Sequence, residues 1–167
     1  MGNTSGKNLD DLVIRPATET DSESIGRLWD NLVDHHHKMD ADLPQAAEDG
    51  NEIYAHHIRQ QILNPYTHVL VAEDQGEVIG YVLGLIVHDS PDMFQHDPSG
   101  FLADIFIQEA YRGCGIGRQL VNALQAWFKS RGVSYMEWYV AAQNEPAKAF
   151  WMAIGGREIM IRMQVKL

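Results

Sequence analysis

Residues 101–131 read FLADIFIQEAYRGCGIGRQLVNALQAWFKSR, and this stretch decides the fold. Its first seven residues are apolar apart from Asp104 and follow a Pro-Ser-Gly turn, a pattern typical of a largely buried strand. After Gly117 the apolar residues recur every three or four positions, which predicts an amphipathic helix that ends at Arg131. The stretch therefore predicts a strand, a glycine-rich turn and a helix in direct succession.

The turn between strand and helix has glycine at every second position. Without side chains at these positions, backbone amides can face a ligand, and the helix that follows adds the positive end of its dipole. Two flanking arginines supply further positive charge. We therefore predict a phosphate-binding loop, which consists of Arg112, Gly113, Cys114, Gly115, Ile116, Gly117 and Arg118.

Several kinds of glycine-rich loop bind phosphate, and two of them do not fit. A nucleotide P-loop needs a lysine and then Ser or Thr after its last glycine, whereas Arg118 and Gln119 stand here. A dinucleotide fingerprint that starts at Gly113 would require a small residue at position 118. A turn that merely joins strand and helix is the remaining alternative, but three alternating glycines between two arginines exceed what a turn requires.

Two ordered motifs resemble the GNAT superfamily of N-acetyltransferases. Residues 107–117, IQEAYRGCGIG, look like the acetyl-coenzyme A (acetyl-CoA) pyrophosphate loop of that family. Residues 144–156, NEPAKAFWMAIGG, look like its second motif, at the expected distance. Within the family, FLADIFI followed by YRGCGIG looks most like the spermidine/spermine-type branch. The resemblance is strongest over residues 100–156.

The resemblance implies how acetyl-CoA would be held as co-substrate. The central strand would splay from a strand at residues 134–141, which frees backbone groups of Phe106 and Ile107 to hold the pantetheine arm and polarise the thioester carbonyl. Residues 112–118 would bind the pyrophosphate, and the second motif would bind the coenzyme on its other side. The residues implied in that second motif are Asn144, Ala147, Phe150 and Trp151.

Asp104 is a candidate catalytic residue. It is the one charge in an otherwise apolar strand, where Leu102 and Phe106 would flank it on its own face. A buried carboxylate is costly without a partner, so it either meets a cation, makes a structural hydrogen bond or opens into a cleft. The polyamine-type branch usually has a glutamate just before this aspartate, and Ala103 stands there instead.

Tyr139 is the second candidate catalytic residue. The family commonly has a tyrosine at the position of Trp151, where it protonates the leaving thiolate, and an indole cannot do so. A thiol reference pKa of about 8.5 makes the coenzyme thiolate a fair leaving group near neutral pH. Tyr139 lies on the neighbouring predicted strand and is a substitute acid, with cross-strand packing as the alternative interpretation.

Length, charge and apolar content exclude several classes of protein. The chain has 167 residues and a mass of 18.8 kDa, the size of one domain. We expect a disordered tail over residues 1–10 and a single acetyltransferase domain over residues 11–167. The formal net charge of −10 argues against nucleic acid and favours cationic partners. No apolar run approaches the roughly 18 residues of a membrane span, and no signal-peptide pattern is present. We expect a cytoplasmic protein with no membrane partner.

We predict no metal site. The single cysteine excludes a CxxC ligand pair and an intramolecular disulfide. The run of histidines at positions 35–37 is expected at a helix end, where consecutive side chains point about 100° apart and cannot converge on one ion. Cys114 lies between two glycines and is interpreted as a tolerated small residue rather than a nucleophile.

The chain as a whole predicts a mixed α/β fold, with a mostly antiparallel twisted sheet flanked by helices on both faces, in the GNAT-like order β-α-α-β-β-β-α-β-α-β. The other expected strands cover residues 12–17, 67–73, 78–88 and 159–167, and an Asp-Gln-Gly-Glu turn joins the second and third strands. The other expected helices end near residues 37, 64 and 155, and an acid-rich loop at residues 39–51 separates the first two.

The function that this sequence favours is transfer of acetyl from acetyl-CoA to a primary amine of a small cationic acceptor by direct attack. Acids in the loop after the first helix, together with Asp104, would attract the amine. Two alternatives stay open: a protein or peptide N-acetyltransferase, and a non-catalytic acyl-CoA-binding regulatory module. A homodimer is also left open.

Overall fold

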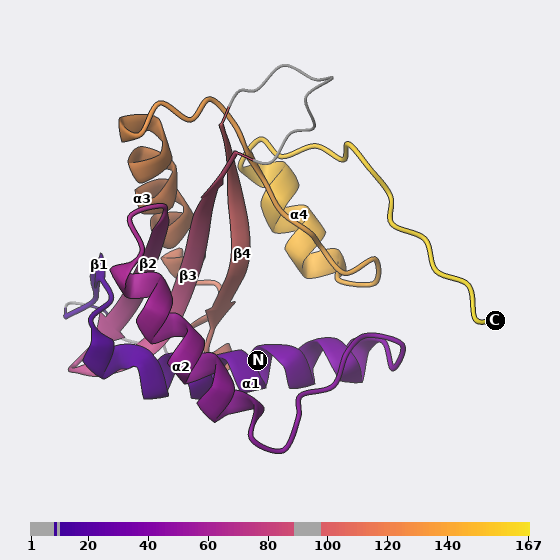
Figure 1. Ribbon diagram of the computed structural model, residues 1–167, viewed down its shortest axis with the longest axis horizontal. Coiled ribbons are helices and arrows are strands. Elements are labelled where there is room, and N and C mark those ends of the chain that lie inside the picture. The colour runs from indigo at the N-terminus through magenta and orange to yellow at the C-terminus, as the bar shows by residue number, and fades with distance from the viewer. Residues whose placement is uncertain (1–8, 10, 89–97) are drawn as a thin grey trace, which may run out of the picture.

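A computed structural model describes residues 9, 11–88 and 98–167, and its strands form one twisted sheet (Figure 1). The strand order is β1-β2-β3-β4-β5, with β1 to β4 antiparallel and β5 parallel to β4. The strands are β1 (Val13–Pro16), β2 (Thr67–Asp74), β3 (Glu77–Val87), β4 (Ser99–Ile107) and β5 (Met136–Glu137). The helices are α1 (Ser22–Met39), α2 (Gly50–Leu63), α3 (Ile116–Ser130) and α4 (Glu145–Ala153), with 3-10 turns η1 (Glu19–Asp21) and η2 (Glu109–Tyr111).

The sheet has a hydrophobic core on each face. Helices α1 and α2 cover one face, and α3 covers the other (Figure 1). The apolar residues of α3 recur at helical spacing and are fully buried at Leu120 and Leu124. On the opposite face, Ile25 of α1 and Ile58 of α2 are also fully buried. The predicted α/β fold class, with helices on both faces of a mostly antiparallel sheet, is confirmed.

The hairpin between β2 and β3 forms at the predicted turn. Gln75 and Gly76 have φ values of 51° and 82°, and a two-residue hairpin turn with both central residues at positive φ matches the natural twist of the strands. This turn fixes the register, in which Asp74 lies opposite Glu77. No helix in the described ranges is long and apolar enough to cross a bilayer.

A β-bulge in β4 decides where Asp104 points. Leu83 of β3 pairs with Asp104, but the next residue, Gly84, pairs with Leu102, so Ala103 is an extra residue in β4. Leu102 consequently packs in the α3-side core, whereas Phe106 packs in the α1–α2-side core. The expectation that Leu102 shares a face with Asp104 is therefore wrong, because one inserted residue reverses the alternation.

The C-terminal part of the chain differs from the expectation. The strand predicted for residues 134–141 is confined to Met136–Glu137, which pair with Gly100 and Phe101 before the two strands diverge. Residues 157–167, here called the C-terminal tail, form no strand, although their apolar residues alternate as predicted. Alternation makes a segment suitable for a sheet, but a strand also needs an edge with which to pair, and the tail lies along none (Figure 1).

The bounds of the other expected strands and helices agree with the structure to within a few residues. The second helix begins earlier than its apolar pattern indicates, at Gly50, so the acid-rich loop covers residues 40–49. The tail expected over residues 1–10 lies outside the described residues except for Leu9, which packs against the α3-side core. Most of the loop expected between the third and fourth strands also lies outside them.

An ion-pair cluster ties β1 to the start of α1. The guanidinium of Arg15 donates two hydrogen bonds to Asp21, of 2.8 and 2.9 Å, and Thr18 donates its backbone N–H to the same carboxylate at 2.7 Å. The Arg15 hydrogen bond is the main cause that lowers the pKa of Asp21 to about 2. The resulting stability is present above the unfolded-state pKa near 3.8 and is lost as the pH falls through about 2.

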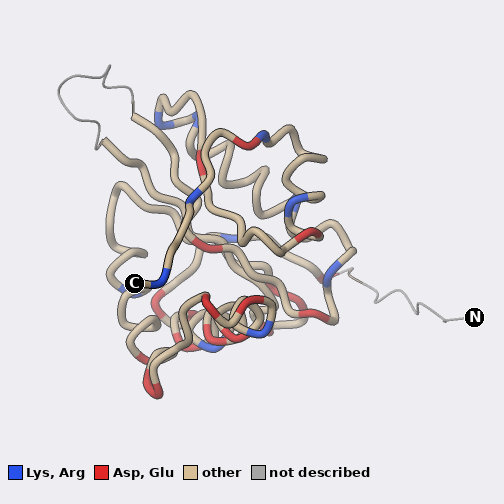
Figure 2. Tube along the Cα trace, turned by 90° about the vertical axis from the view of Figure 1, so that its right-hand side faces the viewer, with Lys and Arg blue, Asp and Glu red and all other residues tan. Residues whose placement is uncertain are grey.

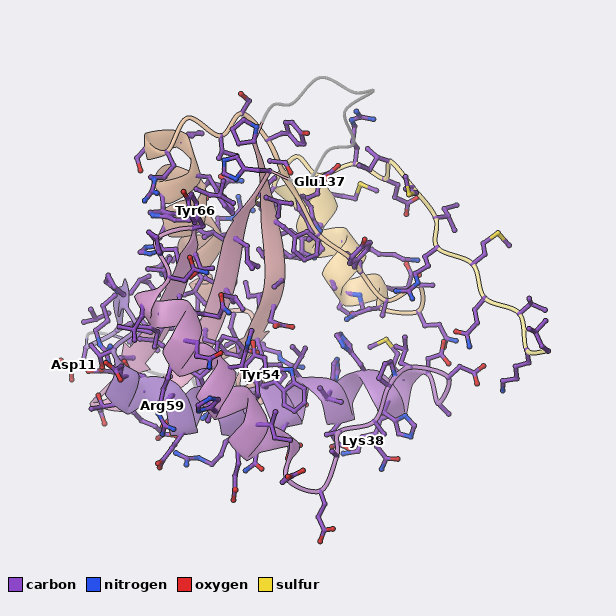
Figure 3. The ribbon with its side chains drawn as sticks, viewed as in Figure 1. Asp11, Lys38, Tyr54, Arg59, Tyr66 and Glu137 are labelled. Atoms are coloured by element: carbon purple, nitrogen blue, oxygen red, sulfur yellow. The ribbon has the colours of Figure 1, made fainter. Side chains whose placement is uncertain are left out.

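We expect Asp21→Asn to lower the free energy of unfolding by on the order of 2 kcal/mol at pH 7, which is the free energy that corresponds to the lowering of the Asp21 pKa from 3.8 to about 2. The difference from the wild type should shrink between pH about 4 and about 2, as the wild-type carboxylate is protonated. Urea unfolding at several pH values measures this. Asp11→Asn is the matched control, since Asp11 is exposed at the periphery (Figure 3). Equal stability of the two variants at pH 7 would refute the account.

Candidate active site

The glycine-rich loop joins η2 to the first turn of α3. Gly113 and Gly115 have φ values of 78° and 81°, and a Cβ atom on either would meet nothing within 4 Å. The backbone conformation, rather than crowding, therefore requires glycine at these positions. Gly115 is the N-cap of α3, so the amides of the next three residues have no acceptor within the helix. These amides and the helix dipole form a site suited to a phosphate group.

Arg112 holds this loop against the end of β4. Its Nε donates to the backbone oxygen of Ile107 at 3.0 Å, and its guanidinium lies 5.1 Å from the ring centre of Phe106. Arg118, on the first turn of α3, is exposed. The sequence predicted that both flanking arginines supply positive charge. In the structure Arg112 also makes a positioning contact, and Arg118 is open to solvent.

The end of β4, the start of α3 and α4 meet at Gly117. A Cβ atom at this glycine would lie 3.2 Å from the Ile107 side chain and 3.5 Å from the Phe150 ring. These contacts bring the two sequence motifs together in space, although more than 20 residues separate them. The coenzyme-binding residues implied by the resemblance therefore line adjacent parts of the molecule.

The outer edge of β4 is open beside this junction. Strand β5 pairs with β4 only at Gly100 and Phe101, so within the described residues no strand covers Phe106 and Ile107 on that side. The Ile107 oxygen already accepts the Arg112 hydrogen bond, but other backbone groups on this edge without a ladder partner need another hydrogen-bonding group. This edge is suited to an extended polar chain such as a pantetheine arm.

The second motif contributes mainly to local structure. The side-chain oxygen of Asn144 accepts a hydrogen bond from the Ala147 N–H at 3.1 Å and so caps α4. Trp151 is buried, with its ring 4.5 Å from that of Trp138 and 4.9 Å from that of Phe150. Trp151 belongs to the core on the α3 side of the sheet, and its side chain packs α4 against that core.

Asp104 lies on the face of the sheet covered by α2 and is half-buried. Its carboxylate accepts a hydrogen bond of 2.7 Å from the hydroxyl of Tyr54, a residue of α2 that lies between this helix and the sheet (Figure 3). Burial raises the pKa of Asp104, and the Tyr54 hydrogen bond and the nearby His57 and His36 oppose that shift. Asp104 is consequently a stronger base than an ordinary aspartate.

Aromatic rings pack around Tyr54, the residue that holds this carboxylate. Tyr54 stacks on Trp29 at 4.8 Å and meets Tyr81 edge-on at 6.3 Å. Burial raises the pKa of both tyrosines, so they stay neutral and can donate hydrogen bonds. The Asp104 carboxylate supplies a charge that could attract an organic cation. Sequence reasoning missed these aromatic residues because each of them also fits an ordinary core position.

Tyr139 lies outside the aromatic cluster. It follows β5 in an irregular segment, is 79% exposed, and contacts the ring of Phe101 at 5.6 Å. The divergence of β5 from β4 after two residue pairs explains this exposure. The structure therefore does not bring the two candidate catalytic residues, Asp104 and Tyr139, together.

The acid-rich loop makes contacts on the α4 side of the molecule. Asp40 accepts a hydrogen bond from Gln143 at 3.4 Å, and Asp42 pairs with Lys166 at 2.8 Å. Cys114 is exposed in the glycine-rich loop, with its Sγ 3.7 Å from the Arg112 oxygen. Across the described residues, no group of three His, Cys, Asp or Glu side chains could hold a metal ion.

Comparison with known proteins establishes the family. Residues 29–155 match the model of the acetyltransferase (GNAT) family, so the chain belongs to that family. Members of the family use acetyl-CoA as co-substrate, and the glycine-rich loop and the open edge of β4 fit such a molecule. The spermidine/spermine branch is not among the relatives described next.

Curated relatives match over part of their length. An aminoglycoside N(6′)-acetyltransferase type 1 from Stenotrophomonas maltophilia is 29% identical over 89 residues, which cover 53% of this chain and 58% of that protein. An L-2,4-diaminobutyric acid acetyltransferase from Virgibacillus pantothenticus is 27% identical over 85 residues, covering 51% and 50%. The match thus spans about half of the length of these curated relatives.

Solved structures match over nearly the whole chain. A mutant of the BH1408 protein from Bacillus halodurans has a TM-score of 0.84 and 26% identity, covering 93% of this chain and 99% of that one. Aminoglycoside N-acetyltransferase AAC(6′)-Iy in complex with CoA has a TM-score of 0.73 and 22% identity, covering 93% and 94%. At that identity, the second likeness supports the fold alone.

Proposed function

We propose that this chain is an acetyl-CoA-dependent N-acetyltransferase whose acceptor is a small cationic molecule with a primary amine. The observation that carries the proposal is the half-buried carboxylate of Asp104, held by Tyr54 among aromatic rings. It lies three residues before Ile107, where β4 leads towards the glycine-rich loop. In this proposal the cation site and the phosphate site would lie along one strand and the loop that follows it.

The reaction needs positioning more than unusual chemistry. The neutral amine attacks the thioester carbonyl, so that a C–N bond forms, the C–S bond breaks and the coenzyme leaves as a thiolate. An alkylammonium has a reference pKa near 10.4, so the acceptor must lose a proton before it attacks. Asp104 would bind the ammonium and accept its proton, a role that the raised pKa of this carboxyl favours.

The open edge of β4 would hold the other reactant. Backbone groups of Phe106 and Ile107 would position the pantetheine arm and polarise the thioester carbonyl, and residues 112–118 would bind the pyrophosphate. Because the thiol pKa of about 8.5 allows the thiolate to leave near neutral pH, the reaction does not depend on an acid at Trp151 or Tyr139.

The relatives support an acceptor with amino groups. Two of them are named for an aminoglycoside and for diaminobutyric acid, which are small molecules that carry amines. The formal net charge of −10 adds a field that concentrates such cations near the protein. A polyamine acceptor remains within the proposal, although Ala103 replaces the glutamate of the polyamine-type branch.

Release of free thiol from acetyl-CoA tests the proposal. We expect release with primary polyamines, amino sugars or diamino acids, and little with peptides or without an acceptor. Preference for peptides would instead indicate a protein acetyltransferase. Binding of acetyl-CoA by calorimetry, without thiol release for any acceptor, would indicate a regulatory module and contradict the proposal.

A further inference from the structure

Two histidines from different helices lie near the Asp104 carboxyl. His36 belongs to the last turn of α1 and is half-buried, whereas His57 of α2 is exposed and its ring centre lies 5.8 Å from that of Tyr54. When protonated, either imidazole lowers the pKa of Asp104, so both lie within electrostatic range of this carboxyl. The proposed reaction uses neither histidine.

The end of α1 has a fixed backbone. The N–H of Asp40 donates to the backbone oxygen of His36 at 3.0 Å and so closes the helix. Nδ1 of His37 lies 3.0 Å from the backbone oxygen of Leu43 in the acid-rich loop. These contacts, together with the packing of α1 against β4, fix the backbone that carries the His36 ring.

Among the described residues, only histidines can exchange a proton with Asp104 near neutral pH. The titratable groups that face this carboxyl are Tyr54 and His57 of α2, Tyr81 of β3 and His36 of α1. Burial raises the pKa of both tyrosines, so they stay protonated. Burial lowers the pKa of His36, as does the charge of His35, while Asp104 opposes this shift. The imidazole of His36 is therefore neutral and has a lone pair that can accept a proton.

The acetylated nitrogen gives up two protons in each turnover. An alkylammonium loses one before it attacks, and the nitrogen loses another when the tetrahedral intermediate becomes an amide. One proton can follow the thiolate, whose reference pKa is about 8.5, but the carboxylate of Asp104 holds only one at a time. A half-buried carboxyl that the acceptor covers therefore needs a second group to take its proton.

We propose that the imidazole of His36 takes the acceptor's proton from Asp104 and releases it to solvent, which restores the carboxylate for the next turnover. The O–H bond of the Asp104 carboxyl breaks, an N–H bond forms on the imidazole, and water or buffer then removes that proton. This inference rests on the proposed function of Asp104. His36 acts through Asp104, as a relay residue rather than as the base that contacts the amine.

Burial also brings the proton affinities of the two groups closer together. It raises the pKa of Asp104 from its ordinary value of 3.8 and lowers that of His36 from 6.5. A small difference in pKa lets the imidazole take the proton from the carboxyl and release it again without trapping it at either group.

The surroundings favour a proton over another ligand for these histidines. Acidic residues outnumber basic ones over residues 19–63, which include α1, α2 and the loop between them (Figure 2). A negative field disfavours a second anion and stabilises a transient imidazolium. In the described ranges, no group of three His, Cys, Asp or Glu side chains is placed to hold a metal ion.

Rescue by buffer gives the first test. With a primary diamine that the wild type acetylates, His36→Gln should lower kcat at least ~10-fold, and free imidazole should restore the rate because it replaces the missing proton acceptor. His56→Gln is the matched control, since His56 is exposed on α2 and its ring lies 3.2 Å from the Gln60 amide nitrogen. A wild-type rate in His36→Gln, a lower rate that imidazole does not restore, or a loss confined to His57→Gln would overturn the proposal.

NMR titration of the imidazoles gives a second test that does not depend on turnover. The pKa of His36 should lie below 6.5 in the wild type, and Asp104→Asn should lower it further, because the carboxylate raises it. A His36 titration that Asp104→Asn leaves unchanged would show that the two groups do not interact, and the relay would fail. Absence of amine acetylation by the wild type would instead contradict the proposed function, so the two failures are distinct.

Discussion

Asp104→Asn is expected to lower kcat/KM for a cationic primary amine by ~10²–10⁴-fold, the usual contribution of a general base. The substitution keeps the shape of the side chain and an oxygen for the Tyr54 hydrogen bond, but it removes the charge and the proton acceptor. Affinity for CoA should stay within about twofold, because the predicted phosphate site lies in the glycine-rich loop. Asp30→Asn, an exposed acid on α1, is the matched control.

The same substitution should raise stability at neutral pH. Because burial raises the pKa of Asp104, its neutral form stabilises the fold below the unfolded-state pKa near 3.8, and this contribution is lost as the pH rises through the folded-state pKa. Asn stays neutral at every pH. The melting temperature of Asp104→Asn should therefore exceed that of the wild type by a few degrees at pH 7 and approach it near pH 3.5.

Tyr54→Phe gives an independent test of whether the Asp104 carboxyl acts as the base. The Tyr54 hydrogen bond lowers the pKa of Asp104, so its removal should raise that pKa. The base acts in its ionised form, and the acidic limb of the pH profile of kcat/KM should move to higher pH. Wild-type kinetics in Asp104→Asn, with an unmoved acidic limb in Tyr54→Phe, would show that Asp104 is structural.

Gly115→Asp is expected to weaken binding of acetyl-CoA by ~10²-fold. It places a negative charge at the N-terminus of α3 and removes one or two charge-assisted hydrogen bonds to phosphate. It also forces an L-residue to adopt a φ of 81°, which costs roughly 1 kcal/mol.

The effect of backbone strain in Gly115→Asp can be separated from the effect of the added charge, because a second glycine provides a matched control. Gly76 in the β2–β3 hairpin has a φ of 82°, with nothing within 4 Å of its Cβ position. Gly76→Asp should therefore lose a similar amount of stability and keep wild-type affinity for the coenzyme. Calorimetric titration that gives Gly115→Asp an affinity within about threefold of the wild type would show that the phosphate site lies elsewhere.

Much of the fold and of the coenzyme loop could be predicted from the sequence because local rules decide them. Alternating glycines followed by a helical apolar pattern indicate a positive-φ loop at a helix start, and Gly113 and Gly115 have that conformation. The Gln75–Gly76 turn likewise follows from the two residues between its strands. Each signal lies within a few residues of the structure that it specifies.

Long-range features could not be predicted in this way. The bulge at Ala103 depends on the pairing with β3, and it decides that Asp104 faces Tyr54, 50 residues away in the chain. From the sequence alone, Tyr54 cannot be distinguished from an ordinary core residue, because the carboxylate that lies beside it in the fold is distant in the chain. The alternation of the C-terminal tail correctly describes a strand-forming pattern, but a pattern within one segment cannot say which edge, if any, it meets.

The central claim is that acetyl passes from acetyl-CoA to the nitrogen of a cation bound at Asp104. The most direct test is mass spectrometry of the products from three acceptors of equal length: a primary diamine, the corresponding amino alcohol with its nitrogen made quaternary, and the diol. We predict that only the diamine is acetylated, on nitrogen, and that the quaternary compound inhibits while the diol does not. Acetylation of the diol at a comparable rate, or no acetylated amine while thiol is released, would contradict the account.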